Sequence, residues 1–504
     1  MSERTAGLLL HPTSLPGRYA IGDLGPEAER FLAWARDAGQ SWWQILPLGP
    51  PERGNSPYTA LSAFAGNPLL ISPDLLIREG LLAAGDVAEV PALSPAGVDF
   101  EQVIPWKERL LRRSWELFER RATPTLRAEL RGFAEAPAQQ AWLDDWALFS
   151  ALRIRHRRRG WWKWPPALAH RDASALTNAR RAESREVDFQ RYVQFLFRRQ
   201  WSRLRRIAAG YGIRLFGDLP IYVALDSADV WVHRELFDLD EEGRPRAVAG
   251  VPPDAYSETG QLWGNPLYRW DQVASEGYRW WIERVRANLE LCDRLRIDHF
   301  RGFVAYWRVP AGAETAAVGE WVDGPGRRFF DALRGALGRP SLEDLPLVAE
   351  DLGVITPDVE ALRRKLGLPG MKVLHFAFGE DDSEHLPDRF EPACVVYTGT
   401  HDNDTTVGWY QSLDDEARRR HRRYTGAAAD VHWTLIELAY ESVAETAMVP
   451  VQDVLGLDRE ARMNTPAVAE GNWSWRLRES QLTPELARRL RALVESGDRS
   501  PSGE

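Results

Sequence analysis

Basic and acidic side chains crowd the end of an apolar run in LRIDHFRGF, residues 295–303. Apolar and polar residues alternate there as in a strand, whose successive side chains point to opposite faces, so Arg296 and Asp298 would share one face. A permanent cation nearby favours the ionised form of a carboxylate, which suits a nucleophile or an electrostatic stabiliser. An isolated Arg-x-Asp pair is more often a structural ion pair, so the interpretation depends on whether other carboxylates lie nearby.

Three further acids follow apolar runs elsewhere in the chain. Asp218 lies in IRLFGDLPIYV, Glu350 in LPLVAEDLG and Asp402 in ACVVYTGTHDND. In a barrel of parallel strands, the side chains at the carboxyl ends of the strands meet at one rim. Four acids from four strand ends would then converge on one site, which favours a functional cluster over a set of solvated surface residues.

A convergence of carboxylates serves two main chemistries, metal binding and the cleavage of glycosidic bonds. The ten histidines include no H-x-H or H-E-x-x-H pair, and such pairs are typical of metal sites. We therefore expect no metal and no cofactor. Glycosidic chemistry needs one carboxylate as a nucleophile and one carboxylic acid as a proton donor, and the cluster could supply both.

The sequence context of each acid predicts its role. Arg296 should keep Asp298 ionised, which predicts that Asp298 is the nucleophile. Glu350 follows an apolar run without a neighbouring cation, so burial and negative charge nearby should raise its pKa to suit a general acid/base. Asp402 would hold sugar hydroxyls and stabilise an oxocarbenium-like transition state. Several of the 22 tryptophans lie in polar, glycine-rich stretches such as QLWGNPLYRW (261–270) and offer flat platforms for sugar rings.

Eight strand-like runs alternate with helical patterns along the chain, which indicates parallel βαβ units. The predicted fold class is therefore a (β/α)8 TIM barrel with helical insertions, as one elaborated barrel over residues 1–504. We expect a mainly helical insertion at 67–212, a second insertion at 223–290, and no C-terminal β-domain. The predicted strands lie at 6–16, 41–50, 213–223, 295–300, 345–353, 371–378, 393–404 and 447–457.

The composition, with 44% apolar and 27% charged residues, is that of a globular protein. A net charge of −9 argues against nucleic acid or an anionic membrane as a partner. One basic run, RHRRRGWWKW at 155–164, could bind RNA but is better explained as a solvated helix face. The N-terminus has no apolar stretch long enough for a signal peptide, and no run could span a membrane, so we expect a cytoplasmic protein. Cys292 and Cys394 are expected to be inert core residues without a disulfide framework.

Several motifs together resemble one enzyme family. LRIDHFRGF, VAEDLG, GTHDNDT and above all GVPPDAYSETGQLWGNPLY (250–268) are similar to the 4-α-glucanotransferases called amylomaltases or disproportionating enzymes, which belong to the wider α-amylase clan. HPTSLPG near the start, NSPYTALSAFAGNPLLI (55–71) and RMNTPAVAEGNWSWR (462–476) resemble the same family. The resemblance therefore spans nearly the whole chain.

This resemblance implies an enzyme that cuts α-1,4-glucans with retention and passes the fragment through a covalent glycosyl-enzyme to the 4-hydroxyl of an acceptor glucan or glucose. It assigns the nucleophile, acid/base and transition-state stabiliser to Asp298, Glu350 and Asp402. Tyr58 would stack on the transferred glucose. The residues expected to hold the sugar hydroxyls or the nucleophile are Asp218, Arg296, His299 and His401. The residues expected in a mobile loop over the site, within 250–268, are Asp254, Glu258, Gln261 and Trp263.

Two other functions remain possible on the residues alone. A retaining hydrolase of the α-amylase type would use the same three acids, but the absence of a C-terminal β-domain and the GQLWGNPLY segment argue against it. A non-catalytic glucan-binding module would need aromatic platforms but no matched acids, and the three acids argue strongly against that function.

Overall fold

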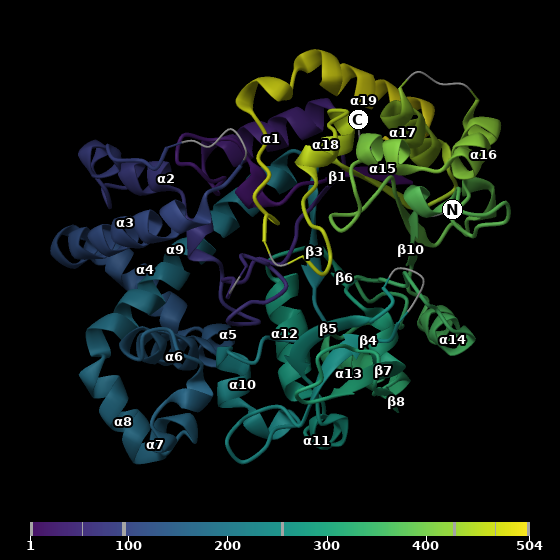
Figure 1. The fold of residues 1–504 in the computed structure, drawn as a ribbon. Coiled ribbons are helices and arrows are strands. Elements are labelled where there is room, and N and C mark those ends of the chain that lie inside the picture. The colour runs from purple at the N-terminus through teal and green to yellow at the C-terminus, as the bar shows by residue number, and fades with distance from the viewer. Residues whose placement is uncertain are drawn as a thin grey trace.

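Eight parallel strands form the central sheet of the protein, for which a computed structural model describes residues 4–52, 54–92, 97–253, 257–426, 430–468 and 470–500 (Figure 1). The strands are neighbours in the order β10-β11-β12-β1-β2-β3-β6-β9. Their bounds are β1 (Thr5–Leu9), β2 (Trp42–Gln44), β3 (Arg214–Leu219), β6 (Arg294–Ile297), β9 (Leu347–Ala349), β10 (Gly370–Val373), β11 (Cys394–Tyr397) and β12 (Thr446–Pro450).

The sheet curls into a barrel. The amide of Ala349, at the end of β9, donates to the carbonyl of Pro369, just before β10, at 2.9 Å. This bond joins the two edges of the sheet. All eight strands predicted from the sequence are present, all ladder pairs between them are parallel, and the predicted (β/α)8 barrel is confirmed.

Helices pack on the outside of the barrel, and local sequence sets where they begin and end. α1 (Pro26–Asp37) starts with a proline in its first position and is followed by Gly39 at φ +73°, a conformation that favours glycine. Thr483 caps α19 (Pro484–Ser496), where its side chain accepts from the amide of Leu486 at 3.2 Å. The other helices after β3 are α10 (Ala228–Val232), α11 (Trp270–Ser275), α12 (Arg279–Leu289), α13 (Arg327–Ala336), α14 (Pro357–Leu366), α15 (Thr406–Ser412), α16 (Asp415–Thr425), α17 (Val431–Glu441), α18 (Val451–Val454) and α19 (Pro484–Ser496).

The described part of the connection between β2 and β3 is helical. Figure 1 shows these helices gathered on one side of the barrel, drawn from purple to blue. The long helix α9 (Ser184–Gly210) packs against α6 (Leu143–Arg155) and leads into β3. The helices are α2 (Pro73–Arg78), α3 (Phe100–Arg121), α4 (Pro124–Glu135), α5 (Pro137–Gln140), α6 (Leu143–Arg155), α7 (Pro166–Ala169), α8 (Ala173–Ala182) and α9 (Ser184–Gly210).

A second, antiparallel sheet lies beside the barrel and was not expected from the sequence. Its order is β5-β4-β7-β8, with β4 (Ala247–Val251), β5 (Gln261–Pro266), β7 (Ala305–Pro310) and β8 (Glu320–Asp323). The segment 250–268, expected as a loop, therefore contains the end of β4 and all of β5. Gly260 lies just before β5 at φ +67°, where a Cβ atom would meet the carbonyl oxygen of Val251 at 2.3 Å, so the close approach there requires glycine.

Two other expectations concern the core and the membrane. Cys292 and Cys394 are buried and free, and burial raises the pKa of the Cys394 thiol to about 12, which makes it a poor nucleophile.

Among the described residues, none of the helices combines the length and apolar character needed to cross a lipid bilayer.

One fully buried arginine fastens the end of the chain to the barrel. The side chain of Arg499 is 0% exposed. Burial lowers its pKa to about 10, so it stays charged at neutral pH. It donates between 2.7 and 3.2 Å to five backbone carbonyls, those of Thr5, Ala439, Tyr440, Ser442 and Ala444. These bonds connect β1, the end of α17 and the turn before β12.

We predict that Arg499→Met lowers the free energy of unfolding by about 3–5 kcal/mol, because it leaves buried carbonyls without donors. In a chain of this length, each kcal/mol corresponds to about 1 °C in the unfolding midpoint, so calorimetry should show a drop of about 3–5 °C. Arg488→Met is the matched control, since the Arg488 side chain in α19 is 69% exposed. Equal midpoints for the two variants would contradict this account.

Candidate active site

The predicted acids lie at the carboxyl ends of the barrel strands. Asp218 belongs to β3, Asp298 directly follows β6, Glu350 directly follows β9, and Asp402 lies in the turn after β11. The charges of the other three all raise the pKa of Asp298, which requires that the four carboxyl groups lie close together. The structure therefore gathers these acids at the rim where barrel active sites occur.

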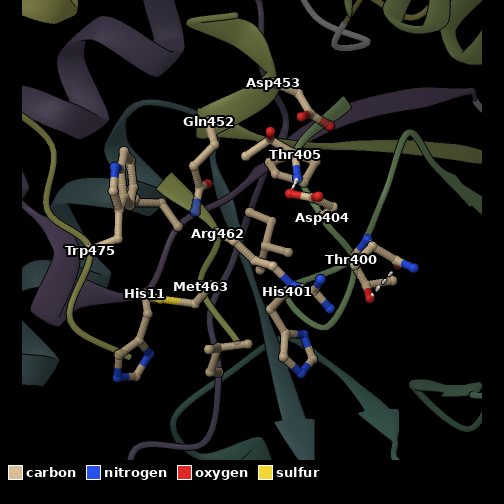
Figure 2. Close-up of a pocket in the computed structure, with 15 residues that line it drawn as sticks. His11, Thr400, His401, Asp404, Thr405, Gln452, Asp453, Arg462, Met463 and Trp475 are labelled. Carbon is tan, nitrogen blue, oxygen red and sulfur yellow. Dashed lines mark hydrogen bonds between the residues drawn. The ribbon is translucent and has the colours of Figure 1, made fainter. Parts of the chain in front are cut away.

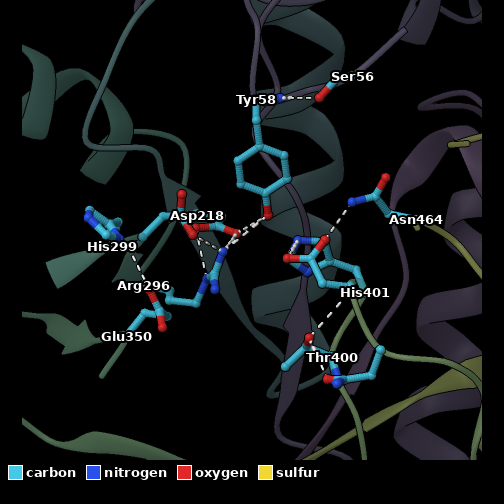
Figure 3. A network of polar contacts seen from close by, with 12 residues as sticks. Ser56, Tyr58, Asp218, Arg296, His299, Glu350, Thr400, His401 and Asn464 are labelled. Carbon is cyan, nitrogen blue, oxygen red and sulfur yellow. Dashed lines mark hydrogen bonds and ion pairs between the residues drawn. The ribbon is translucent and has the colours of Figure 1, made fainter. Parts of the chain in front are cut away.

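The guanidinium of Arg296 is the centre of this cluster (Figure 3). Its side chain is 4% exposed. Nε and Nη2 donate to the two carboxylate oxygens of Asp218 at 3.0 and 2.8 Å, and Nη2 also donates to Oδ1 of Asp298 at 2.8 Å. The hydroxyl of Tyr58 donates to Oδ2 of Asp218 at 2.5 Å and accepts from Nη2 at 3.2 Å. Burial lowers the pKa of Arg296, but the charges of Asp218 and Asp298 raise it by more, so Arg296 is a permanent cation.

Asp298 carries opposing influences on its charge. Burial raises its pKa, Arg296 lowers it, and the carboxylates of Asp218, Glu350 and Asp402 raise it further, to about 8. The sequence-based argument that Arg296 keeps Asp298 ionised was therefore incomplete. It described the cation two residues away correctly but did not include burial and the three acids from other strands.

Glu350 is held by backbone amides. The amide of His299 donates to Oε2 at 2.7 Å and that of Leu352 to Oε1 at 2.8 Å. Burial raises the pKa of Glu350, as the sequence led us to expect, while Arg296 and the two amides lower it. His299 has φ 53°, a left-handed backbone conformation that is uncommon for residues other than glycine. This strained residue is the one whose amide donates to Glu350.

Asp402 has two partners that were not assigned a role from the sequence. Nδ2 of Asn464 donates to Oδ1 of Asp402 at 2.6 Å, and Nη2 of Arg462 donates to its backbone carbonyl at 2.6 Å. Nε of Arg462 also donates to the carbonyl of Asn464 at 2.7 Å. Both residues lie in RMNTPAVAEGNWSWR, and the resemblance of this segment to the family was the only signal that could have drawn attention to them.

A buried carboxyl behind the turn supports Asp402 and His401. Asp453 accepts from the hydroxyl of Thr398 at 2.6 Å and from the amide of Thr406 at 2.7 Å, at the two ends of the turn. Figure 2 shows Asp453, His401 and His11 around a small cavity of about 20 Å³. That volume could hold at most one water molecule and is too small for a sugar ring. The hydrogen bonds of Asp453, rather than a ligand in this cavity, hold the turn in place.

Aromatic rings line the space around the acids. The ring of Tyr58 stacks on that of His401, with centroids 5.1 Å apart and planes at 11°, and lies 5.8 Å from Trp473. Burial lowers the pKa of His401, so its imidazole is neutral at neutral pH. Trp263 of β5 meets the ring of His299 edge to face at 4.7 Å, so the second sheet reaches the site at this point.

The four residues expected in a covering loop lie in different places. Gln261 and Trp263 are in β5, where the indole nitrogen of Trp263 donates to the side-chain oxygen of Gln261 at 3.2 Å. Glu258 is exposed in the turn before β5. Asp254 lies outside the described residues.

The arrangement suits the cleavage of a glycosidic bond. The carboxylate of Asp298 accepts from the cation Arg296, and that of Glu350 accepts from two backbone amides. The carboxylate of Asp402 accepts from the side-chain amide of Asn464, and aromatic rings lie beside all three acids. In the described ranges, no group of three or more His, Cys, Asp or Glu side chains has a geometry that could hold a metal ion.

Comparisons with known proteins point in the same direction. A family model described as 4-alpha-glucanotransferase matches residues 10–483. The 4-alpha-glucanotransferase of Thermus thermophilus is 48% identical, over 98% of this chain and 99% of its own length, and that of Synechocystis sp. is 48% identical, over 98% of each. The solved structure of an amylomaltase from Streptococcus agalactiae in complex with acarbose has a TM-score of 0.95 at 34% identity, covering 99% of this chain and 100% of that chain.

The charge coupling in the cluster predicts how the pH dependence changes in Asp218→Asn. This variant removes one negative charge that raises the pKa of Asp298, so that pKa should fall, and the anion of Asp298 should persist to lower pH. The acid limb of the profile of kcat/KM against pH should therefore move to lower pH, by about one unit, which corresponds to about 1.4 kcal/mol.

Asp226→Asn is the control for this prediction. Asp226 is also buried and pairs with Arg153 at 2.9 Å, but it is not among the main charges that shift the pKa of Asp298. A limb that stays in place, or moves to higher pH, in Asp218→Asn would show that Asp218 does not raise the pKa of Asp298.

Proposed function

Because the chain belongs to the 4-alpha-glucanotransferase family, we propose that its cluster of acids transfers a segment of an α-1,4-glucan from a donor malto-oligosaccharide to the 4-hydroxyl of an acceptor glucan or glucose. The chain is an enzyme of the glucanotransferase class. The observation that carries the mechanism is the pair Asp298 and Glu350, two half-buried carboxyl groups of which Asp298 pairs with Arg296.

The different partners of the two carboxyl groups support different roles. Both pKa values are raised and the groups interact, so the pair retains a proton near neutral pH. A carboxylate bonded to a guanidinium is favoured as an anion, which assigns the negative charge to Asp298. Glu350 then holds the proton, the state that a general acid requires.

In the first step, the Asp298 carboxylate attacks the anomeric carbon of the donor. The bond from this carbon to the leaving oxygen breaks, and Glu350 gives its proton to that oxygen. The product is a glycosyl-enzyme ester on Asp298 and a shortened glucan with a free 4-hydroxyl. Asp402, oriented by Asn464, would hold sugar hydroxyls and stabilise the positive charge that develops on the ring.

In the second step, Glu350 takes the proton from the 4-hydroxyl of the acceptor, whose oxygen attacks the anomeric carbon and releases Asp298. Two inversions at one carbon give overall retention. Water could attack in place of the acceptor and would make the enzyme a hydrolase. A bound acceptor has an effective molarity of up to ~10⁵ M or more, so contacts that position the acceptor favour transfer.

Contacts from the second sheet support such positioning. Trp263 packs on His299, whose amide holds Glu350, so the sheet is anchored next to the proposed acid/base. A sugar ring that lies on Trp263 would be close to the group that must deprotonate it. We propose that Gln261 and Trp263 contact the acceptor and that Tyr58 contacts the transferred glucose.

The distribution of products from maltotriose tests this function. Transfer conserves the number of reducing ends while it redistributes chain lengths, whereas hydrolysis adds one reducing end for each bond cut. We predict that the enzyme releases glucose and builds longer chains from maltotriose while total reducing ends stay nearly constant. Chromatography of the products and a reducing-sugar assay on the same samples measure both quantities.

Asp298→Asn is the control and should give neither product. A rise in reducing ends that keeps pace with the release of glucose would make the protein a hydrolase. Unchanged maltotriose with the unsubstituted enzyme would count against α-1,4-glucan as the substrate.

A further inference from the structure

Glu350 lies beside the seam where the two edge strands of the barrel sheet meet. It directly follows β9, and β9 and β10 are the two ends of the strand order. In the part of the chain that the structure describes, a single backbone hydrogen bond joins these strands, from the amide of Ala349 to the carbonyl of Pro369. The other neighbouring strands pair along ladders. On this side, contacts other than strand pairing must therefore fix the position of Glu350.

The carboxylate of Asp351 crosses this seam. Its Oδ1 accepts from the amide of Met371 in β10 at 2.7 Å. Its Oδ2 forms an ion pair with Nε of Arg363 in α14 at 2.9 Å. A Cβ atom at Gly370 would clash with this carboxylate, so only glycine lets β10 begin so close to it. Asp351 thus connects the end of β9 to both β10 and the helix that precedes β10.

The partners of Asp351 are themselves fixed. Arg363 is 9% exposed, and its Nη1 donates to the carbonyl of Leu368, between α14 and β10, at 3.2 Å. Burial raises the pKa of Asp351, whereas the Met371 amide and the charges of Arg363 and Lys372 lower it. Well-placed partners of this kind offset the cost of removing a carboxylate from water. A shift of the carboxylate away from them would lose that compensation.

Asp351 also lies in the middle of the turn that holds Glu350. The amide of Leu352 donates to Oε1 of Glu350 at 2.8 Å, and that of His299 donates to Oε2 at 2.7 Å (Figure 3). A movement of Asp351 would move the Leu352 amide, and with it the carboxyl group of Glu350. The charge of Asp351 raises the pKa of Glu350 as well, which is the direction that a general acid needs.

We propose that Asp351 is a positioning residue for Glu350, because its contacts with Met371 and Arg363 hold turn 350–352 against β10. The inference rests on the proposed function, since it takes Glu350 as the acid/base. Asp351 does not contact the sugar but acts through Glu350. A general acid must lie within about 2.6–3.2 Å of the atom that it protonates, so a small displacement of the turn impairs protonation first.

Two donors that differ in their need for an acid test this inference. Maltotriose needs a proton on its leaving oxygen, whereas α-maltotriosyl fluoride does not. Asp351→Ala should lower kcat/KM about ten- to hundredfold for glucose release from maltotriose, but less than about threefold for fluoride release. Asp351→Asn keeps an oxygen for the Met371 amide and loses the ion pair, so its loss on maltotriose should be smaller, about three- to tenfold.

Asp226→Ala is the matched control. Asp226 is 3% exposed, pairs with Arg153 at 2.9 Å and accepts from the amide of Trp161 at 3.2 Å, so it makes the same two kinds of contact as Asp351. It is not among the main groups that shift the pKa of Glu350. This variant should lower the unfolding midpoint about as much as Asp351→Ala does, without favouring one donor over the other.

An equal loss on both donors in Asp351→Ala, or an unchanged kcat/KM for maltotriose, would overturn the inference and leave Asp351 a role in stability alone. If Asp351→Ala does not fold, Asp351→Asn decides by the same comparison. Glu350→Gln is the reference for a lost acid and should lose activity on maltotriose while it still releases fluoride. An equal loss on both donors in Glu350→Gln would count against the proposed function instead.

Discussion

The buried guanidinium of Arg296 ties together the strand ends at the rim of the barrel. Its donors join Asp218 of β3 to Asp298 after β6, and the hydroxyl of Tyr58 completes the network from the segment after β2. Removing an ion from water costs several kcal/mol, which only well-placed partners can offset. The strand ends therefore cannot shift without leaving a buried charge unpaired. The acids around this cation outnumber it, and together with burial they raise the pKa of Asp298.

Much of the fold could be predicted because barrel strands leave a local signal. Each predicted run holds a buried strand, such as β6 in LRIDHF, and Pro26 and Gly39 bracket α1 as their chemistry requires. The antiparallel sheet was missed for a physical reason. β5 has the sequence QLWGNP, whose glycine and proline predict a loop, and it is stabilised by pairing with β4 rather than by its own propensity.

The positions of Asp218, Asp298 and Glu350 were predictable, because each of these acids lies at the end of an apolar run that forms a barrel strand. Contacts from distant segments were not predictable. Asn464 bonds to Asp402 from 62 residues away, in a segment without helical or strand periodicity. The pKa of Asp298 was misjudged for the same reason, because the sequence displays the neighbouring arginine but not the acids that folding brings beside it.

The central claim is that Asp298 forms a covalent bond to the sugar, while Glu350 protonates the leaving oxygen and then deprotonates the acceptor hydroxyl. The most direct measurement is intact mass spectrometry of Glu350→Gln treated with α-maltotriosyl fluoride, whose leaving group needs no protonation. Without the acid/base to activate an acceptor, the glycosyl-enzyme should accumulate, and peptide mapping should place the added maltotriosyl mass on Asp298. Fluoride release without any adduct, or an adduct on another carboxylate, would contradict the account.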